Sequence, residues 1–358
     1  MKLISVVGAR PQFIKHSPVQ RELSLIDGLT HSVIHTGQHY DADMSDVFFR
    51  ELGIDAPDYN IGIGSGSHGL QTGRMLIAIE EIFLREQPNA VLVYGDTNST
   101  LAGALAAAKL NIPVLHVEAG LRSYDRNMPE EVNRRMTDHV SSILFAPTQQ
   151  AVENLLAEGI GGSSVELVGD VMLDAFRHFL PVAGGIENCT PQEYVLCTIH
   201  RAENTDNRGK LLVITEALQR ISAIISVVIP LHPRTRQRLV DFKLLETWER
   251  SFELIGPAGY LAMLKLEADA KVIVTDSGGI QKEAFFAKRN CVTLRSSTEW
   301  TELLSLGVNR LSPPDDPERI FDDTVAMLKH PFPESVDLYG AGDASKKIAK
   351  RLTSLLGA

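Results

Sequence analysis

Three carboxylates follow short apolar runs of the sequence, and their positions suggest acid–base chemistry. Asp96 ends the run AVLVYGD, Glu118 follows PVLHV, and Glu130 lies a little further on in NMPEEVNRR. In open parallel sheets ligands bind beyond the carboxyl ends of the strands, so these side chains are candidates for one site. Carboxylates that share a site acquire separated pKa values, which lets one act as a base and another as an acid. A helix cap is the simpler interpretation of Asp96, and spacing alone leaves both open.

Two cations follow the first apolar run and could hold an anionic ligand. Arg10 and Lys15 come after Gly8, and Pro11 stands near the expected start of a helix. The free amides at the start of a helix favour an anion, and proline is common in the first turn. A surface turn with an incidental arginine and lysine is an equal alternative.

The second half of the chain offers a further anion site in the stretch DSGGIQKEA. Its glycines let backbone amides approach a phosphate at a helix start, and Glu283 on that helix could accept a ribose hydroxyl. Two histidines follow other apolar runs, His200 in CTIHRAEN and His232 in IPLHPRTR, where a structural role is as common as a functional one. The anion-binding candidates here are His232, Ser277, Gly278, Gly279 and Glu283.

The elements that must position these residues form an alternating α/β series. Short runs rich in valine and isoleucine alternate with segments whose apolar residues recur at helical spacing, which is typical of parallel sheets. Periodicity breaks near residues 175–192, where we expect a linker. The sequence therefore predicts two Rossmann-like, doubly wound α/β domains, residues 1–175 and 176–342, and an amphipathic terminal helix at 343–358.

Composition limits the partners. No run approaches the roughly 18 apolar residues of a membrane span, and a net charge of −10 argues against nucleic acid or an anionic membrane. The three cysteines have no metal-ligand spacing, and the N-terminus has no secretory leader, so we expect a soluble, cytoplasmic protein. No dinucleotide or metal motif is present, so the sequence requires no cofactor.

The motifs GARPQFIK, TGQHYDADM, GDTNST, HVEAGLRS, PEEVNR, TIHRAEN and DSGGIQKEA, in this order, resemble the non-hydrolysing UDP-N-acetylglucosamine 2-epimerase family. The resemblance implies the glycosyltransferase-B (GT-B) architecture, with two Rossmann-like domains, an interdomain cleft and a C-terminal helix that crosses back to the first domain. It implies a homodimer and a UDP-sugar substrate. It also implies the reaction, in which C2 loses a proton, UDP leaves to give a glycal, and UDP adds back as a proton arrives on the opposite face.

The resemblance also implies roles for individual residues. Asp96, Glu118, Glu130 and His200 match the catalytic positions, whereas Arg10, Lys15, Ser277, Gly278, Gly279 and Glu283 match positions that hold UDP. Abstraction of a weakly acidic C–H proton needs a desolvated base, and departure of UDP needs cations and amides on the diphosphate.

Departures from the common family pattern bear on the sugar. This chain has GARPQFIK for GTRPEAIK, QKEA for QEEA and TEWTE for TERPE, so Trp300 replaces an arginine. These variants resemble the subgroup that acts on UDP-2,3-diacetamido-2,3-dideoxy-glucuronate for surface polysaccharide. An acidic sugar needs an additional cation, and the sugar-binding candidates are Gln38, His39, Arg122, Arg126, Arg134 and Arg135.

Three alternatives stay open. The chain could act on UDP-N-acetylglucosamine itself, it could be a GT-B glycosyltransferase, or it could be a catalytically silent nucleotide-sugar sensor. The three acids and His200 disfavour the last two. We also expect the glycine-rich stretch 62–73 to form a mobile loop that takes part in closure.

Overall fold

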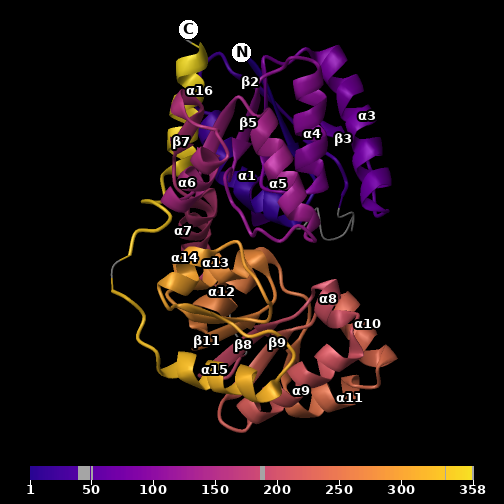
Figure 1. Ribbon diagram of the computed structural model, residues 1–358, viewed down its shortest axis with the longest axis vertical. Helices are drawn as coiled ribbons and strands as arrows, with labels where there is room; N and C mark the ends of the chain where they lie inside the picture. Colours follow the sequence, from indigo (N-terminus) through magenta and orange to yellow (C-terminus); the bar gives the residue numbers. More distant parts are fainter. Residues whose placement is uncertain (39–48, 50, 186–189, 335, 357–358) are drawn as a thin grey trace. The chain divides into compact units, whose positions relative to one another are not determined.

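The computed structural model describes the chain except residues 39–48, 50, 186–189, 335 and 357–358. The chain divides into two compact units, one made of residues 1–177 and 337–358, the other of residues 178–336. Each unit is a parallel sheet flanked by helices (Figure 1), so the predicted α/β class is confirmed. Among the described residues no helix is both long and apolar enough to cross a membrane.

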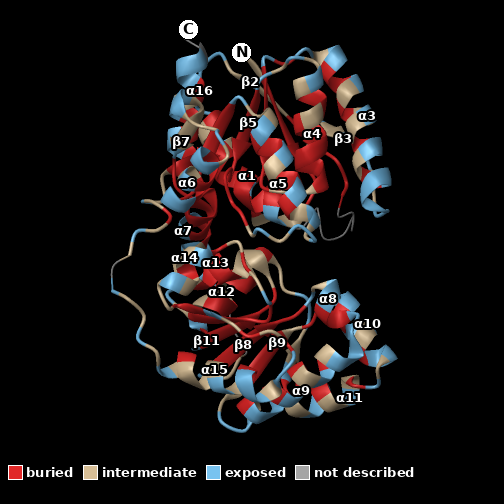
Figure 2. Cartoon of the chain, in the orientation of Figure 1, coloured by how far each residue is buried: buried red, intermediate tan, exposed pale blue. Residues whose placement is uncertain are grey.

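The first unit contains a seven-stranded parallel sheet in the order β3-β2-β1-β4-β5-β6-β7. Its central strands are short runs of β-branched and leucine residues that are buried on both faces, as in other parallel sheets (Figure 2). The strands are β1 Lys2–Val7, β2 Thr30–His35, β3 Tyr59–Asn60, β4 Ala90–Tyr94, β5 Val114–Val117, β6 Ile143–Ala146 and β7 Val165–Leu167. The helices are α1 Arg10–Leu23, α3 His68–Glu86, α4 Asn98–Lys109, α5 Pro129–Val140, α6 Gln149–Ala157, α7 Val171–Ala183, whose residues 178–183 belong to the second unit, and α16 Ala344–Leu356.

The second unit contains a six-stranded parallel sheet in the order β10-β9-β8-β11-β12-β13. Its core includes the fully buried Trp248, whose Nε1 donates to Thr215 Oγ1 at 2.8 Å. The strands are β8 Tyr194–Thr198, β9 Ser226–Pro230, β10 Glu253–Ile255, β11 Val272–Thr275, β12 Asn290–Thr293 and β13 Asn309–Leu311. The helices are α8 Ala202–Thr205, α9 Arg208–Ser222, α10 Pro233–Asp241, α11 Leu245–Ser251, α12 Tyr260–Asp269, α13 Gly278–Phe286, α14 Thr301–Ser305 and α15 Pro317–Lys329.

The terminal helix α16 belongs to the first unit, where it packs against α1. Asp174 on α7 accepts the backbone amides of Ala344 (3.2 Å) and Ser345 (2.9 Å) and so caps α16 from a distant part of the chain. Burial raises the pKa of Asp174 to about 6, although these two amide hydrogen bonds act in the opposite direction.

The expected helix start near Pro11 is confirmed, whereas two other sequence-based boundaries were wrong. Helix α1 begins at Arg10, so Arg10 and Lys15 both lie on it, and Gln12 stabilises this start by accepting the amides of Gly8 and Ala9. Helix α3 begins at His68, so residues 68–73 of the predicted mobile loop are helical. Helix α7 ends at Ala183, so residues 175–183 of the predicted linker are helical. In both α3 and α7 a buried apolar face outweighs the local glycine and proline signals.

Candidate active site

Sheet order brings the carboxyl ends of β1, β4 and β5 together in the first unit. Val6 pairs with Val93 in one ladder, and Tyr94 pairs with Val117 in the next, so the three strands end at nearly the same level. The residues after them therefore converge, as the rule for open parallel sheets predicts. Glu118 directly follows β5, and Asp96 lies two residues after β4.

Glu118 is buried and has a strained backbone. Its side chain is 5% exposed, and its φ of 70° lies in the left-handed region that non-glycine residues seldom occupy. The amides of Glu118 and Ala119 both donate to the carbonyl of Phe145 on β6, each at 3.1 Å, and hold the chain in this conformation. Strain of this kind is concentrated at functional sites, which supports a role for Glu118.

Glu118 forms a buried ion pair with Lys15, which projects from α1. Gly95 packs directly against this pair: a Cβ atom added there would lie 2.9 Å from Lys15 Nζ and 3.1 Å from Glu118 Oε2. Gly95 also has a φ of 63°, so both its conformation and its close approach require glycine. Lys15, which the resemblance assigned to UDP, is thus also the partner of the buried carboxylate.

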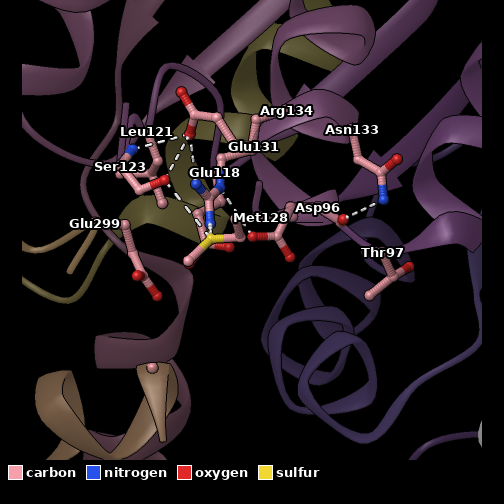
Figure 3. A network of polar contacts seen from close by, with 12 residues as sticks. Asp96, Thr97, Glu118, Leu121, Ser123, Met128, Glu131, Asn133, Arg134 and Glu299 are labelled. Atoms are coloured by element: carbon pink, nitrogen blue, oxygen red, sulfur yellow. Dashed lines mark hydrogen bonds and ion pairs between the residues drawn. The ribbon is translucent and has the colours of Figure 1, made fainter. Parts of the chain in front are cut away.

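Asp96 is not a helix cap. Thr97 caps α4, and its Oγ1 accepts the amide of Thr100 at 3.3 Å. The Asp96 carboxylate instead pairs with Arg134 Nε at 2.9 Å (Figure 3). The Asp96 side chain is 29% exposed. Asn133 on α5 donates to the Asp96 carbonyl at 2.9 Å, which fixes the backbone as well. The carboxylate is therefore oriented yet accessible.

Glu131, which the sequence analysis missed, organises the segment before α5. It accepts the amide and hydroxyl of Ser123 (2.9 and 3.1 Å) and pairs with Arg134 Nη1 at 2.8 Å (Figure 3). Burial raises the pKa of Glu131, but the Ser123 amide and the charge of Arg134 outweigh it and lower the pKa overall. The neighbouring Glu130 is half-buried and has no hydrogen bond or ion pair with another described residue. Of the two adjacent glutamates, Glu131 is therefore held by the surrounding residues and Glu130 is not, as far as the described residues go.

Arg122 is not available to a sugar, contrary to the expectation. Its side chain is completely buried and pairs with Asp138 at 2.7 Å and with Glu158 at 2.8 Å. Asp138 also bonds His116 Nδ1 at 2.7 Å, and His116 Nε2 reaches the carbonyl of Gly95 at the same distance. Desolvation would raise the pKa of Asp138, yet its bonds to His116 and Arg122 keep it below the usual value. This network therefore supports the backbone beneath Glu118.

The other sugar-binding candidates differ in accessibility. Gln38 is buried, and its Oε1 accepts the Ser99 amide at 2.9 Å, so it fastens the segment after β2 to α4. His39 lies outside the described residues. Arg135 is half-buried and reaches Glu131 at 3.3 Å. Arg126 is exposed and has no ion pair with any described residue, which leaves it as the available cation of this group.

In the second unit the ends of β8 and β11 lie side by side, because Thr198 pairs with Thr275. The buried Asp276 accepts the amides of His200 (3.1 Å) and Arg201 (3.0 Å) and ties the two strand ends together. Ser277 caps α13 by accepting the Ile280 amide at 3.5 Å. The two glycines that follow are the first helical residues, at the helix start where the sequence places them.

The remaining candidates surround this helix start or lie on α13. His200 is 44% exposed with its Nδ1 3.6 Å from Asp276 Oδ1, and its ring centroid lies 6.5 Å from that of the exposed His232. Glu283 is buried on α13. Trp300 is also buried, and its Nε1 donates to the carbonyl of Gly278 at 3.0 Å. The second unit thus presents two histidines and the free amides of α13, a combination suited to an anion.

Comparison with solved structures shows the type of fold and the class of enzyme. A solved structure of UDP-GlcNAc 2-epimerase from Methanocaldococcus jannaschii, in complex with UDP-GlcNAc and UDP, has a TM-score of 0.93 and 44% identity, covering 99% of this chain and 100% of that chain. A Neisseria meningitidis UDP-GlcNAc 2-epimerase bound to UDP-GlcNAc has a TM-score of 0.89 and 32% identity, covering 99% of this chain and 100% of that chain. The fold is therefore of the GT-B type, and the protein is an isomerase that acts on carbohydrates.

The sequence comparisons show the family. The profile described as UDP-N-acetylglucosamine 2-epimerase matches residues 21–353. A Methanococcus maripaludis protein described as a UDP-N-acetylglucosamine 2-epimerase homolog is 49% identical, covering 99% of this chain and 100% of its own length. The UDP-2,3-diacetamido-2,3-dideoxy-D-glucuronate 2-epimerase of Pseudomonas aeruginosa is 46% identical with the same coverage. The chain belongs to the UDP-N-acetylglucosamine 2-epimerase family, the non-hydrolysing UDP-sugar 2-epimerases, as the motifs predicted.

Proposed function

We propose that this chain inverts C2 of a UDP-2-acetamido sugar with the carboxylates of its first unit, and that the sugar is UDP-2,3-diacetamido-2,3-dideoxy-glucuronate. The observation that carries the reaction is Glu118, a buried carboxylate on a strained backbone, with Asp96 oriented nearby. A carboxylate removes the C2 proton, the C1–O bond to UDP breaks, and a C1=C2 double bond forms. UDP then adds back to C1 while an acid delivers a proton to the other face of C2.

Each unit contributes a different part of this chemistry. Asp96, Glu118 and Glu130 supply the base and the acid, because all three lie beyond the carboxyl ends of the first sheet. The α13 amides and His200 in the second unit stabilise the negative charge that develops on the departing diphosphate. Arg10, in the first turn of α1, is a further candidate for that diphosphate. We propose that the enzyme works as a cytoplasmic homodimer.

The acidic sugar is supported by the Pseudomonas aeruginosa relative and by Arg126. An exposed guanidinium without an ion pair to a described residue can bind the C6 carboxylate bidentately. The second candidate is UDP-N-acetylglucosamine, which the Methanocaldococcus jannaschii structure contains. That sugar carries no carboxylate, so it would leave Arg126 without a ligand.

Deuterium incorporation tests both levels of the proposal. The purified protein is incubated in heavy water with each UDP-sugar, and C2 exchange is followed by NMR. We expect exchange with the diacetamido uronate, and a KM for this sugar that rises in R126Q while the KM for UDP-N-acetylglucosamine does not. Exchange with the simple sugar alone would contradict the substrate assignment. Exchange with neither sugar would contradict the reaction.

A further inference from the structure

The first turn of α13 is already in contact with a carboxylate of the protein. Glu299 lies in the segment between β12 and α14, and a Cβ atom added to Gly278 would lie 2.5 Å from Glu299 Oε1. The Glu299 side chain is only 9% exposed, so water screens its charge poorly. The carboxylate thus lies at the end of the helix where free amides and the helix dipole favour a negative charge.

Two arginines accompany this carboxylate. Arg295 Nη2 pairs with Glu299 Oε2 at 3.1 Å, and the Arg295 side chain is 2% exposed. Arg295 Nη1 is buried and has no hydrogen-bond partner among the described residues. Arg201 Nη2 lies 3.9 Å from the same Cβ position on Gly278. A buried guanidinium nitrogen without an acceptor is costly, so the site has capacity for more anionic oxygen than Glu299 supplies.

We propose that Glu299 is an internal occupant of the diphosphate site, filling the first turn of α13 in the free enzyme and giving way when UDP binds. The inference rests on the proposed function, in which α13 holds the diphosphate. A carboxylate and a diphosphate cannot share one helix start, because both are anions that need the same amides and arginines. Displacement of Glu299 frees Arg295, whose unpaired nitrogen and charge then turn to the diphosphate.

Competition of this kind weakens UDP binding. UDP is cleaved from C1 and adds back to it while it stays at the site, and the epimerised UDP-sugar must then leave, so a site that bound the diphosphate as tightly as possible would slow product release. Replacing the carboxylate with an isosteric amide removes the competing charge and leaves the shape of the turn. We therefore expect E299Q to bind UDP about tenfold more tightly than the wild type, the effect of one charge-assisted contact that need no longer be broken.

Isothermal titration of the full-length protein with UDP and with inorganic pyrophosphate tests the proposal. Both ligands should bind more tightly to E299Q. The control E246Q changes an exposed glutamate on α11 of the same unit and should bind both ligands like the wild type. E299D keeps the negative charge near Arg295 but moves it away from Gly278, so its affinity for UDP and pyrophosphate should rise less than that of E299Q. If E299Q fails to fold, E299D serves as the test.

Each other outcome has a definite meaning. Unchanged or weaker UDP binding in folded E299Q would overturn the proposal. Unchanged UDP binding together with weaker binding of the UDP-sugar would overturn it in favour of a direct contact between Glu299 and the sugar. A wild-type protein that binds neither UDP nor a UDP-sugar would refute the proposed function itself, which separates that failure from the failure of the Glu299 inference.

Discussion

Replacing Lys15 with methionine removes the partner of Glu118 and tests the central feature of the first unit. The two side chains are 8% and 5% exposed, so the pair is almost entirely shielded from water. Removal of one member of a buried ion pair costs about 3–5 kcal/mol, because the other charge is left without compensation. Methionine has nearly the volume of the lysine stem and adds little cavity cost. We expect K15M to lower the free energy of unfolding by about 3–5 kcal/mol.

A double-mutant cycle isolates the pair from other effects. In K15M/E118Q the second change removes the uncompensated charge, so the double variant should recover at least about 2 kcal/mol relative to the sum of the single changes. Urea unfolding is followed by circular dichroism. Tryptophan fluorescence serves as an internal control, because both tryptophans, Trp248 and Trp300, lie in the second unit.

A cost of less than about 1 kcal/mol for K15M, or additivity of the two single changes, would contradict this role of the ion pair. Either result would mean that the ion pair does not hold Glu118 in place. Lys15 would then be a diphosphate ligand alone, and UDP affinity would fall in K15M without a change in unfolding.

Three further predictions concern the same unit. G95A places a methyl group 2.9 Å from Lys15 Nζ on a backbone with a φ of 63°. This change should lower the free energy of unfolding, measured by urea titration, by about 1–3 kcal/mol and should abolish C2 exchange. R134M releases Asp96 and should slow C2 deuterium exchange about 10²-fold at unchanged melting temperature of the second unit, with partial recovery in R134K. Burial lowers the pKa of His31 to about 4, so between pH 6.5 and pH 4 the unfolded chain binds a proton at this residue and the folded chain does not. The free energy of unfolding should therefore be highest above pH 6.5 and fall by up to about 3 kcal/mol towards pH 4. In H31Q the urea midpoint should no longer fall with pH in this range.

Local sequence was sufficient for the sheets and for the places where chemistry occurs. Short valine- and isoleucine-rich runs alternate with helical periods, and a parallel strand can be recognised from a few neighbouring residues. Once the strands are known, the rule for strand ends places Asp96 and Glu118 at the site. The local signal for the start of α1 was also present, since Pro11 and Gln12 form its first turn and its capping contact.

The sequence by itself thus determined the α/β class, the positions of the acids and the family. Tertiary structure alone decided which charges meet. Lys15 and Glu118 are 103 residues apart and become partners because β1, β4 and β5 are neighbours in the sheet. Arg122, which the sequence suggested as a cation for the sugar, instead forms ion pairs with Asp138 and Glu158. Propensity acts over a few residues, whereas an ion pair depends on strand order, which local residues do not encode.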